Sequence, residues 1–131
     1  MIVITGAAGF IGSCMTSKLN HEKHHDLILV DDFSKESKKP NWQDKQYTDK
    51  IHRDDFFAWA HANAQHITCI IHLGARTDTT EMDYSVFEQL NVGYTQEMWS
   101  FATQYRIPLL YASSAATYGA GELGYVDDES I

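Results

Sequence analysis

Residues 1–12, MIVITGAAGFIG, decide the fold of this chain. A short apolar run rich in β-branched residues ends in three glycines, Gly6, Gly9 and Gly12, spaced three residues apart. A buried strand, a glycine turn and a helix form the context in which such a motif binds a dinucleotide. Gly6 permits a tight turn, Gly9 lets a pyrophosphate approach the main chain, and Gly12 lets the helix pack close to the strand.

The helix predicted after the turn is amphipathic, and one face of it carries Ile11, Cys14 or Met15, and Leu19. The first N–H groups of a helix have no partners within it and carry partial positive charge, which favours phosphate groups. We therefore expect the turn, together with Phe10 and Ile11, to bind the phosphates of a dinucleotide. The alternative for this pattern alone is a glycine-rich helix start that binds no ligand.

A second buried strand is predicted at residues 27–30, where Leu-Ile-Leu-Val forms a continuous apolar run. Asp31 and Asp32 follow it, and Asp31 lies 19 positions after Gly12. In dinucleotide-binding folds an acidic residue about 20 positions after the glycines binds the adenosine ribose. We assign Asp31, with Asp32 beside it, to that role. The alternative is a cap or turn residue at the end of the strand.

The rest of the chain continues the alternation of strands and helices. After a long mobile loop over the cofactor site, at residues 33–47, we expect a helix at 54–64, a strand at 68–72, a helix at 84–106 and a strand at 109–112. This pattern predicts an α/β fold of Rossmann type, a doubly wound parallel sheet in three layers with strand order 3-2-1-4, truncated at its C-terminal side. We expect residues 1–131 to form one NAD(P)-binding domain without a substrate domain.

Composition excludes several classes of function. The net charge of −8 argues against a nucleic-acid surface, which needs clustered Lys and Arg. No apolar run approaches the ~20 residues that span a bilayer, and Cys14 and Cys69 are expected to be reduced and buried. These features predict a cytoplasmic protein without nucleic-acid or membrane partners. His21, His24 and His25 cluster before the second strand, but no carboxylate or cysteine pattern supports a metal site there.

Four segments resemble the extended short-chain dehydrogenases, the group of nucleotide-sugar epimerases and dehydratases. In chain order they are Thr5-Gly-Ala-Ala-Gly-Phe-Ile-Gly12, His72-Leu-Gly-Ala75, Asn91-Val-Gly-Tyr-Thr95 and Tyr111-Ala-Ser-Ser-Ala-Ala-Thr-Tyr-Gly119. Within that group, residues 72–81 and 112–119 look most like the ADP-L-glycero-D-manno-heptose 6-epimerase family. The resemblance runs from residue 1 to about residue 119 and is weakest over residues 34–65.

The resemblance implies transient oxidation and re-reduction of a nucleotide-sugar substrate in the synthesis of lipopolysaccharide core heptose. In that family a serine, matched here by Ser114, donates a hydrogen bond to the reacting oxygen, and a Tyr-x-x-x-Lys pair supplies the base. This chain contains no Tyr-x-x-x-Lys. We therefore expect the N-terminal fragment of a longer enzyme, inactive by itself, with a homo-oligomer as one option for the full length. The alternatives are a dehydratase or 4-epimerase of the same group, or a non-catalytic dinucleotide-binding module.

Two opposing observations bear on the choice of cofactor. Asp31 favours NAD because a carboxylate repels a 2′-phosphate. The resemblance favours NADP, since Lys38 and Arg53 match the basic residues that the heptose 6-epimerases use. We predict NADP, with NAD as the alternative. The motif after the strand at 68–72 and the later Asn motif add the remaining expected cofactor contacts, which are Leu73, Gly74, Ala75, Arg76, Thr77 and Asn91.

Overall fold

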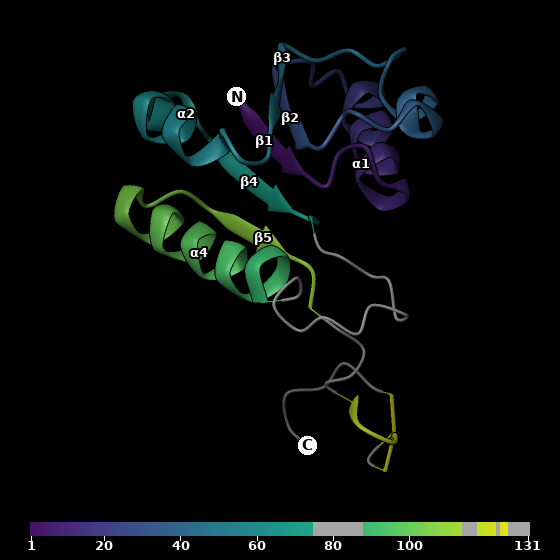
Figure 1. Ribbon diagram of the computed structural model, residues 1–131, viewed down its shortest axis with the longest axis vertical. Helices are drawn as coiled ribbons and strands as arrows, with labels where there is room; N and C mark the ends of the chain where they lie inside the picture. The colour runs from purple at the N-terminus through teal and green to yellow at the C-terminus, as the bar shows by residue number, and fades with distance from the viewer. Residues whose placement is uncertain (75–87, 114–117, 123, 126–131) are drawn as a thin grey trace.

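The computed structural model describes residues 1–74, 88–113, 118–122 and 124–125 (Figure 1). The strands are β1 (Ile2–Thr5), β2 (Leu27–Asp31), β3 (Asp49–His52), β4 (Cys69–His72) and β5 (Leu109–Tyr111). The α-helices are α1 (Phe10–His21), α2 (Phe56–Asn63) and α4 (Tyr94–Tyr105). Shorter helical segments are the 3₁₀ helices η1 (Glu36–Asn41) and η2 (Ala64–His66) and the π-helical segment η3 (Glu88–Gly93).

All five strands are parallel and form one sheet with the order β3-β2-β1-β4-β5. β1 is central: Ile2 lies opposite Leu27 of β2 on one side and opposite Cys69 of β4 on the other. β1, β2 and β4 are largely buried, which explains their continuous apolar sequences. Because the strands are parallel, their carboxyl ends meet at one edge of the sheet, and the glycine turn after β1 lies at that edge.

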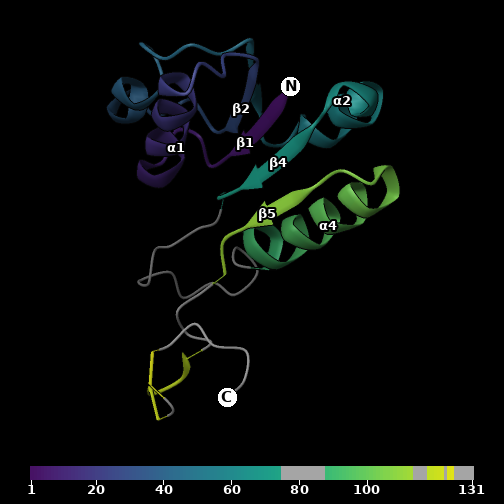
Figure 2. The same cartoon turned by 180° about the vertical axis from the view of Figure 1, so that it is seen from behind.

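The sheet is the middle of three layers. Figures 1 and 2 show α1 on one face of the sheet and α2 and α4 on the other. Successive residues of β1 point to opposite faces, so Val3 belongs to the apolar cluster with Phe56 and Phe101, whereas Ile4 belongs to the cluster with Ala8. The structure thus confirms the predicted fold class, a Rossmann-type parallel sheet covered on both faces by helices.

The predicted strand order, 3-2-1-4, counted the strand at 68–72 as the third strand and placed it beside the second. This was wrong, because the neighbour of β2 is β3, a fifth strand that the sequence did not predict. β3 has one buried side chain, Ile51, between polar residues, and it lies at the edge of the sheet. An edge strand is paired on one side only and tolerates polar and charged residues. With β3 beside β2, the strand predicted at 68–72 lies next to β1, and the strand predicted at 109–112 lies beyond it.

The helices also differ from their predicted bounds. α2 begins at Phe56, two residues later than expected. α4 begins at Tyr94 after the π-helical segment η3, so the predicted helix at 84–106 is regular only over its second half. Residues 84–87 of that prediction lie outside the described residues. These shifts leave the order of elements unchanged.

The buried face of α1 contains Met15 and Leu19, as predicted, together with the smaller Gly12 and Thr16. Gly12 and Thr16 are buried, and Met15 packs against the same cluster as Ile4. Ile11, which the amphipathic pattern placed on the buried face, is 64% exposed. The close approach of α1 to the turn is at Gly12, where a Cβ would lie 2.2 Å from the Gly6 carbonyl oxygen, so the helix presents Gly12 rather than Ile11 to the turn.

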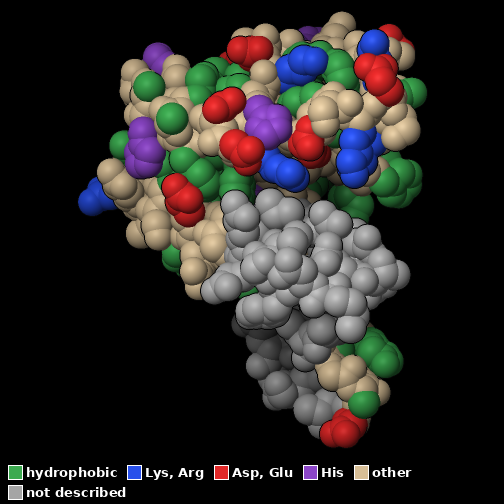
Figure 3. Space-filling view, in the orientation of Figure 1, with side chains coloured by type: hydrophobic (Ala, Val, Ile, Leu, Met, Phe, Trp, Pro, Cys, Tyr) green, Lys and Arg blue, Asp and Glu red, His purple; other side chains and the backbone are tan. Residues whose placement is uncertain are grey.

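Three predictions from composition concern the distribution of charge, membrane-spanning segments and the burial of the two cysteines. On the face shown in Figure 3, acidic, basic and histidine side chains are interspersed, so the net charge of −8 forms no single acidic patch there. Within the described residues no helix is long and apolar enough to cross a membrane. Cys14 is exposed and Cys69 is partly buried, which corrects the expectation that both thiols are buried.

Candidate functional site

The glycine turn after β1 is shaped by one left-handed residue, one close approach and one open side. Gly6 has a φ of +69°, in the left-handed region that favours glycine. A Cβ on Gly12 would lie 2.2 Å from the Gly6 carbonyl oxygen, so α1 can cross the turn at this distance only with glycine there. A Cβ on Gly9 would meet the Gly6 oxygen alone, at 3.2 Å. Among the described residues, the outer side of the turn at Gly9 is therefore open.

The start of α1 adjoins this open side. The Gly9 N–H donates to the Gly6 carbonyl at 3.0 Å, and the Ser13 N–H donates to the Gly9 carbonyl at 2.9 Å. Phe10 and Ile11 lie in the first helical turn, whose N–H groups have no carbonyl partners within the helix. Their side chains are 80% and 64% exposed, and the first turn contains no acidic residue. This helix start can therefore accept an anion.

The Asp31 carboxylate lies directly against the glycine turn. Its Oδ2 accepts a hydrogen bond from the Ala8 N–H at 2.9 Å, and its Oδ1 accepts one from the Asp32 N–H at 2.7 Å. Two features predicted separately from the sequence, the glycine turn and the acidic residue after the second strand, are thus in contact. A carboxylate has about four acceptor positions, so Asp31 retains the capacity to accept a hydrogen bond from a hydroxyl group of a ligand.

Asp32 and Arg53 lie on the same edge. The Arg53 main-chain N–H donates to the Asp31 carbonyl at 3.2 Å, while its guanidinium lies 3.8 Å from the Asp32 carboxylate and 3.9 Å from that of Asp54. Hydrogen bonds from the hydroxyl and the N–H of Ser34 hold the pKa of Asp32 below its usual value, with a smaller contribution from Arg53. Asp32 is therefore ionised at neutral pH, and Arg53 is shared between two carboxylates.

Thr5, at the end of β1, connects the turn with β4. Its hydroxyl lies 2.6 Å from His72 Nδ1 and accepts a hydrogen bond from the Gly74 N–H at 3.0 Å. The other ring nitrogen of His72, Nε2, lies 2.9 Å from the Thr95 hydroxyl of α4. The Leu73 N–H donates to the Thr5 carbonyl at 3.3 Å. The predicted cofactor residues Leu73 and Gly74 are thereby fixed beside the glycine turn.

The buried His72 predicts a pH dependence of stability. Burial lowers the pKa of His72 from its usual 6.5, so the unfolded chain binds a proton that the folded chain resists. This contribution to stability is complete above about pH 6.5 and is lost as the pH falls below it, by at most about 1.4 kcal/mol per pH unit. Chemical unfolding at pH 7.5 and 5.5 should show a smaller loss on acidification for His72→Gln than for the wild type. An exposed histidine variant, His24→Gln, should keep the wild-type loss, and an unchanged loss in His72→Gln would contradict the assignment.

The segment predicted as a long mobile loop, residues 33–47, packs on the turn through Asn41 and Trp42 and includes a helical segment. That helical segment is η1, and Trp42 is buried in the same cluster as Ala7 and Ala8. Lys38 of η1 is partly buried, and in the described part of the chain its side chain makes no hydrogen bond or ion pair. Its neighbour Lys39 is paired instead with Glu36, at 3.8 Å.

Asn41 is a site residue that the sequence did not indicate. Its side-chain amide donates to the Ala8 carbonyl at 2.8 Å, and its main-chain carbonyl accepts a hydrogen bond from the Ser13 hydroxyl at 2.9 Å. An asparagine in a polar segment carries no signal of its own, because such residues are common on loops. The contact follows from how η1 packs on the turn.

Several predicted site residues are not tested by the described structure. Ala75, Arg76, Thr77 and Ser114 lie outside the described residues. Asn91 lies in η3, four residues before Thr95, the residue that contacts His72. The structure therefore assembles the glycine turn, Asp31, Asp32, Arg53, Leu73 and Gly74 at one edge and leaves the other assignments as predictions.

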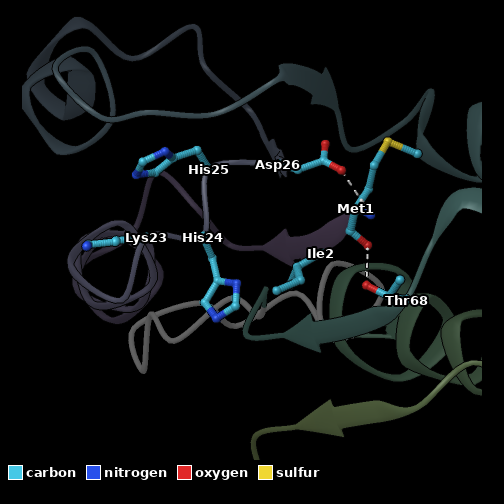
Figure 4. Close-up of a pocket in the computed structure, with 7 residues that line it drawn as sticks. All are labelled: Met1, Ile2, Lys23, His24, His25, Asp26 and Thr68. Carbon is cyan, nitrogen blue, oxygen red and sulfur yellow. Dashed lines mark hydrogen bonds and ion pairs between the residues drawn. The ribbon is translucent and has the colours of Figure 1, made fainter.

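A hollow of about 500 Å³ lies at the amino ends of the strands, opposite the glycine turn. It is lined by Met1, Ile2, Lys23, His24, His25, Asp26 and Thr68. Figure 4 shows that the Lys23 and His25 side chains point to the left of the view, whereas His24 points downward and Asp26 points toward Met1. The Met1 ammonium is already paired with Asp26 at 3.2 Å. Within the described residues no group of three or more His, Cys, Asp or Glu side chains could hold a metal ion.

Comparison with known families and relatives agrees with this geometry. The sequence profile of the NAD dependent epimerase/dehydratase family matches residues 2–131. ADP-L-glycero-D-manno-heptose-6-epimerase of Fusobacterium nucleatum is 45% identical over 99% of this chain and 40% of its own length. The enzyme of that name from Nitratidesulfovibrio vulgaris is 36% identical over 99% of this chain and 41% of its own. The chain thus spans about 40% of the length of these curated relatives.

Solved structures share the fold. UDP-glucuronic acid 4-epimerase from Bacillus cereus, in complex with UDP-glucuronic acid and NAD, matches with a TM-score of 0.77 and 23% identity, over 99% of this chain and 44% of its own. L-threonine dehydrogenase from Clostridium difficile matches with a TM-score of 0.72 and 26% identity, over 92% of this chain and 38% of its own. Because these two proteins catalyse different reactions, the fold alone does not identify an activity.

Proposed function

Since this chain belongs to the NAD dependent epimerase/dehydratase family, we propose that residues 1–131 form the NAD(P)-binding portion of a nucleotide-sugar epimerase of the ADP-L-glycero-D-manno-heptose 6-epimerase type. The proposed reaction interconverts two epimers of an ADP-heptose used for lipopolysaccharide core synthesis. The identity of 45% to a heptose epimerase over 99% of the chain favours this substrate over those of a 4-epimerase or dehydratase.

One observation carries the proposal for cofactor binding: the contact between the glycine turn and Asp31. A dinucleotide needs donors for its pyrophosphate and, about one ribose away, an acceptor for the adenosine hydroxyls. Here the hydrogen bond from the Ala8 N–H, at 2.9 Å, fixes the Asp31 carboxylate beside the turn, whose side at Gly9 is open. The residues present therefore fit a dinucleotide, with the turn and the Phe10 and Ile11 N–H groups toward the pyrophosphate and Asp31 toward the ribose.

The chain's own residues would bind and orient the cofactor. When bound, the nicotinamide supplies the hydride acceptor and donor that an epimerization by oxidation and re-reduction needs. We propose that Ser114 donates a hydrogen bond to the reacting oxygen of the sugar. The 131 residues contain no Tyr-x-x-x-Lys, so we propose turnover only for a protein that also carries this pair. Proton abstraction from a hydroxyl at neutral pH requires such a positioned base.

For the choice of cofactor we propose NADP. A 2′-phosphate on the adenosine ribose would lie near Asp31, where Arg53 offers positive charge, and we propose that Lys38 of η1 adds to it. Arg53 already offsets the charge of Asp32, at 3.8 Å, and Lys38 makes no ion pair among the described residues. The carboxylate of Asp31 supports the alternative, NAD, because it repels a phosphate. Titration with both cofactors distinguishes the two.

Charge reversal tests this choice. Lys38→Glu and Arg53→Glu should each weaken NADP binding at least about tenfold more than NAD binding, because each replaces attraction to the 2′-phosphate by repulsion. The effect should shrink as salt rises from 0.05 to 0.5 M, since partly exposed charges are screened. Calorimetric titrations of the 131-residue chain with NADP and NAD at both salt concentrations would measure it.

Lys39→Glu is the matched control for that experiment. It changes the net charge by the same amount one position away on η1, where Lys39 is paired with Glu36. It should alter NADP and NAD affinities by similar, small factors. Equal losses of NADP and NAD affinity in Lys38→Glu would remove Lys38 from the 2′-phosphate site, and tighter binding of NAD than NADP by the wild type would overturn the choice of NADP.

A further inference from the structure

Ala8, in the glycine turn, has both of its main-chain polar groups bound by side chains from elsewhere. Its N–H donates to the Asp31 carboxylate at 2.9 Å, and its carbonyl accepts a hydrogen bond from the Asn41 amide at 2.8 Å. Ala8 itself is fully buried. The turn is therefore held from two directions, by the end of β2 and by η1.

Asn41 makes this connection with both its side chain and its main chain. While its amide reaches the turn, its carbonyl accepts a hydrogen bond from the Ser13 hydroxyl of α1 at 2.9 Å. Trp42, the next residue, is 9% exposed and belongs to the cluster with Ala7 and Ala8. The C-terminal end of η1 is thus docked on the turn by two hydrogen bonds and one large apolar side chain.

The geometry of η1 places Lys38 relative to this docking point. In a 3₁₀ helix, side chains three residues apart lie on the same side. Lys38 and Asn41 are three apart in η1, so Lys38 lies one turn from the residue that contacts Ala8, on the same side of the helix. Glu36 and Lys39 share another side of η1, where they form an ion pair.

We propose that Asn41 is a positioning residue that sets the preference for NADP over NAD. By fixing η1 on Ala8, it holds the Lys38 ammonium at a set distance from the Asp31 end of the turn, where the adenosine ribose would lie. Without the amide bond, η1 retains two anchors, Trp42 and the hydrogen bond from the Ser13 hydroxyl to the Asn41 main-chain carbonyl, but loses its alignment on Ala8. This inference rests on the proposed function, because it concerns how the same cofactor site discriminates between two dinucleotides.

A double-mutant cycle tests the proposal. Asn41→Ala should weaken NADP binding about tenfold and NAD binding by no more than about twofold, in calorimetric titrations of the 131-residue chain. In the Asn41→Ala background, Lys38→Ala should cost less NADP affinity than it costs in the wild type, because Lys38 is no longer held in place. Asn41→Asp, which is the same size but lacks the donor, should repeat the effect and serves if the alanine variant does not fold.

Asn20→Ala is the matched control. Asn20 of α1 binds the other end of the same segment through its side chain. Its Nδ2 donates to the Gln46 carbonyl and its Oδ1 accepts from the Gln46 N–H, both at 2.8 Å. It should leave the ratio of NADP to NAD affinity unchanged. Equal loss of both cofactors in Asn41→Ala, additive effects of Asn41→Ala and Lys38→Ala, or the same selectivity loss in Asn20→Ala would overturn the role of Asn41. Failure of the wild type to bind either cofactor would instead overturn the proposed function, and the inference with it.

Discussion

Gly12→Val should destabilise the fold by roughly 3 kcal/mol or more, the largest effect on stability expected from a single substitution in the turn. A Cβ at this position would lie 2.2 Å from the Gly6 carbonyl oxygen and 2.7 Å from its carbon. Both are main-chain atoms, so α1 as a whole must move away from the turn. Overpacking of this kind costs about 1–3 kcal/mol even where side chains can adjust, and here none can. Urea unfolding followed by circular dichroism measures the change.

Two further variants separate this clash from other effects of the substitution. Gly12→Ala introduces the same Cβ without the branch and should lose most of the same stability. Cys14→Val places a valine at an exposed position of the same helix and should change stability by no more than about 0.5 kcal/mol. Wild-type stability of Gly12→Ala would show that α1 does not lie as close to the turn as the structure has it.

Gly9→Val should have the opposite profile, with loss of dinucleotide binding and a largely intact fold. Gly9 has φ −79° and ψ 172°, which any residue adopts, and a Cβ would meet only the Gly6 oxygen at 3.2 Å. The branched side chain would instead fill the open side of the turn, where the proposed site places the pyrophosphate. We expect affinity for NADP and NAD to fall by at least ~100-fold, equivalent to about 2.7 kcal/mol, in calorimetric titrations.

The accompanying loss of stability should stay within about 1 kcal/mol, the scale of a poor N-cap residue. Gly9→Ala, with a single methyl group, should lose an intermediate amount of affinity. Thr103→Val, on the exposed side of α4 far along the chain, serves as the control and should bind as the wild type does. Wild-type affinity in Gly9→Val would show that the phosphates do not lie on this turn.

The parts of the site that the sequence predicts are those fixed by local backbone chemistry. Gly6 needs a positive φ and Gly12 a close approach, and both requirements can be recognised from the spacing of the glycines after an apolar run. Asp31 could be placed because parallel strands end at one edge, so a residue after the second strand lies beside the turn after the first. The contact at 2.9 Å between Asp31 and Ala8 follows from that topology.

The parts that the sequence did not predict depend on packing between distant segments. β3 has one buried side chain, and the pairing of its backbone with β2 leaves no apolar pattern to detect. Ile11 fits the helical period of the buried face formed by Gly12, Met15, Thr16 and Leu19, yet the close approach of α1 to the turn at Gly12 leaves Ile11 64% exposed. Asn41 acquires its role from the way η1 docks on Ala8, which no local rule specifies.

A titration of the ¹⁵N-labelled chain with NADP, followed by two-dimensional amide NMR, shows whether a dinucleotide binds on the glycine turn. We expect saturable shifts that are largest for the amides of residues 6–12 and for Asp31 and Asp32. The amides around Lys23, His25 and Thr68, which line the hollow at the opposite edge, should not move. Shifts concentrated at that hollow, or no shifts at millimolar NADP and NAD, would contradict binding of a dinucleotide on the glycine turn.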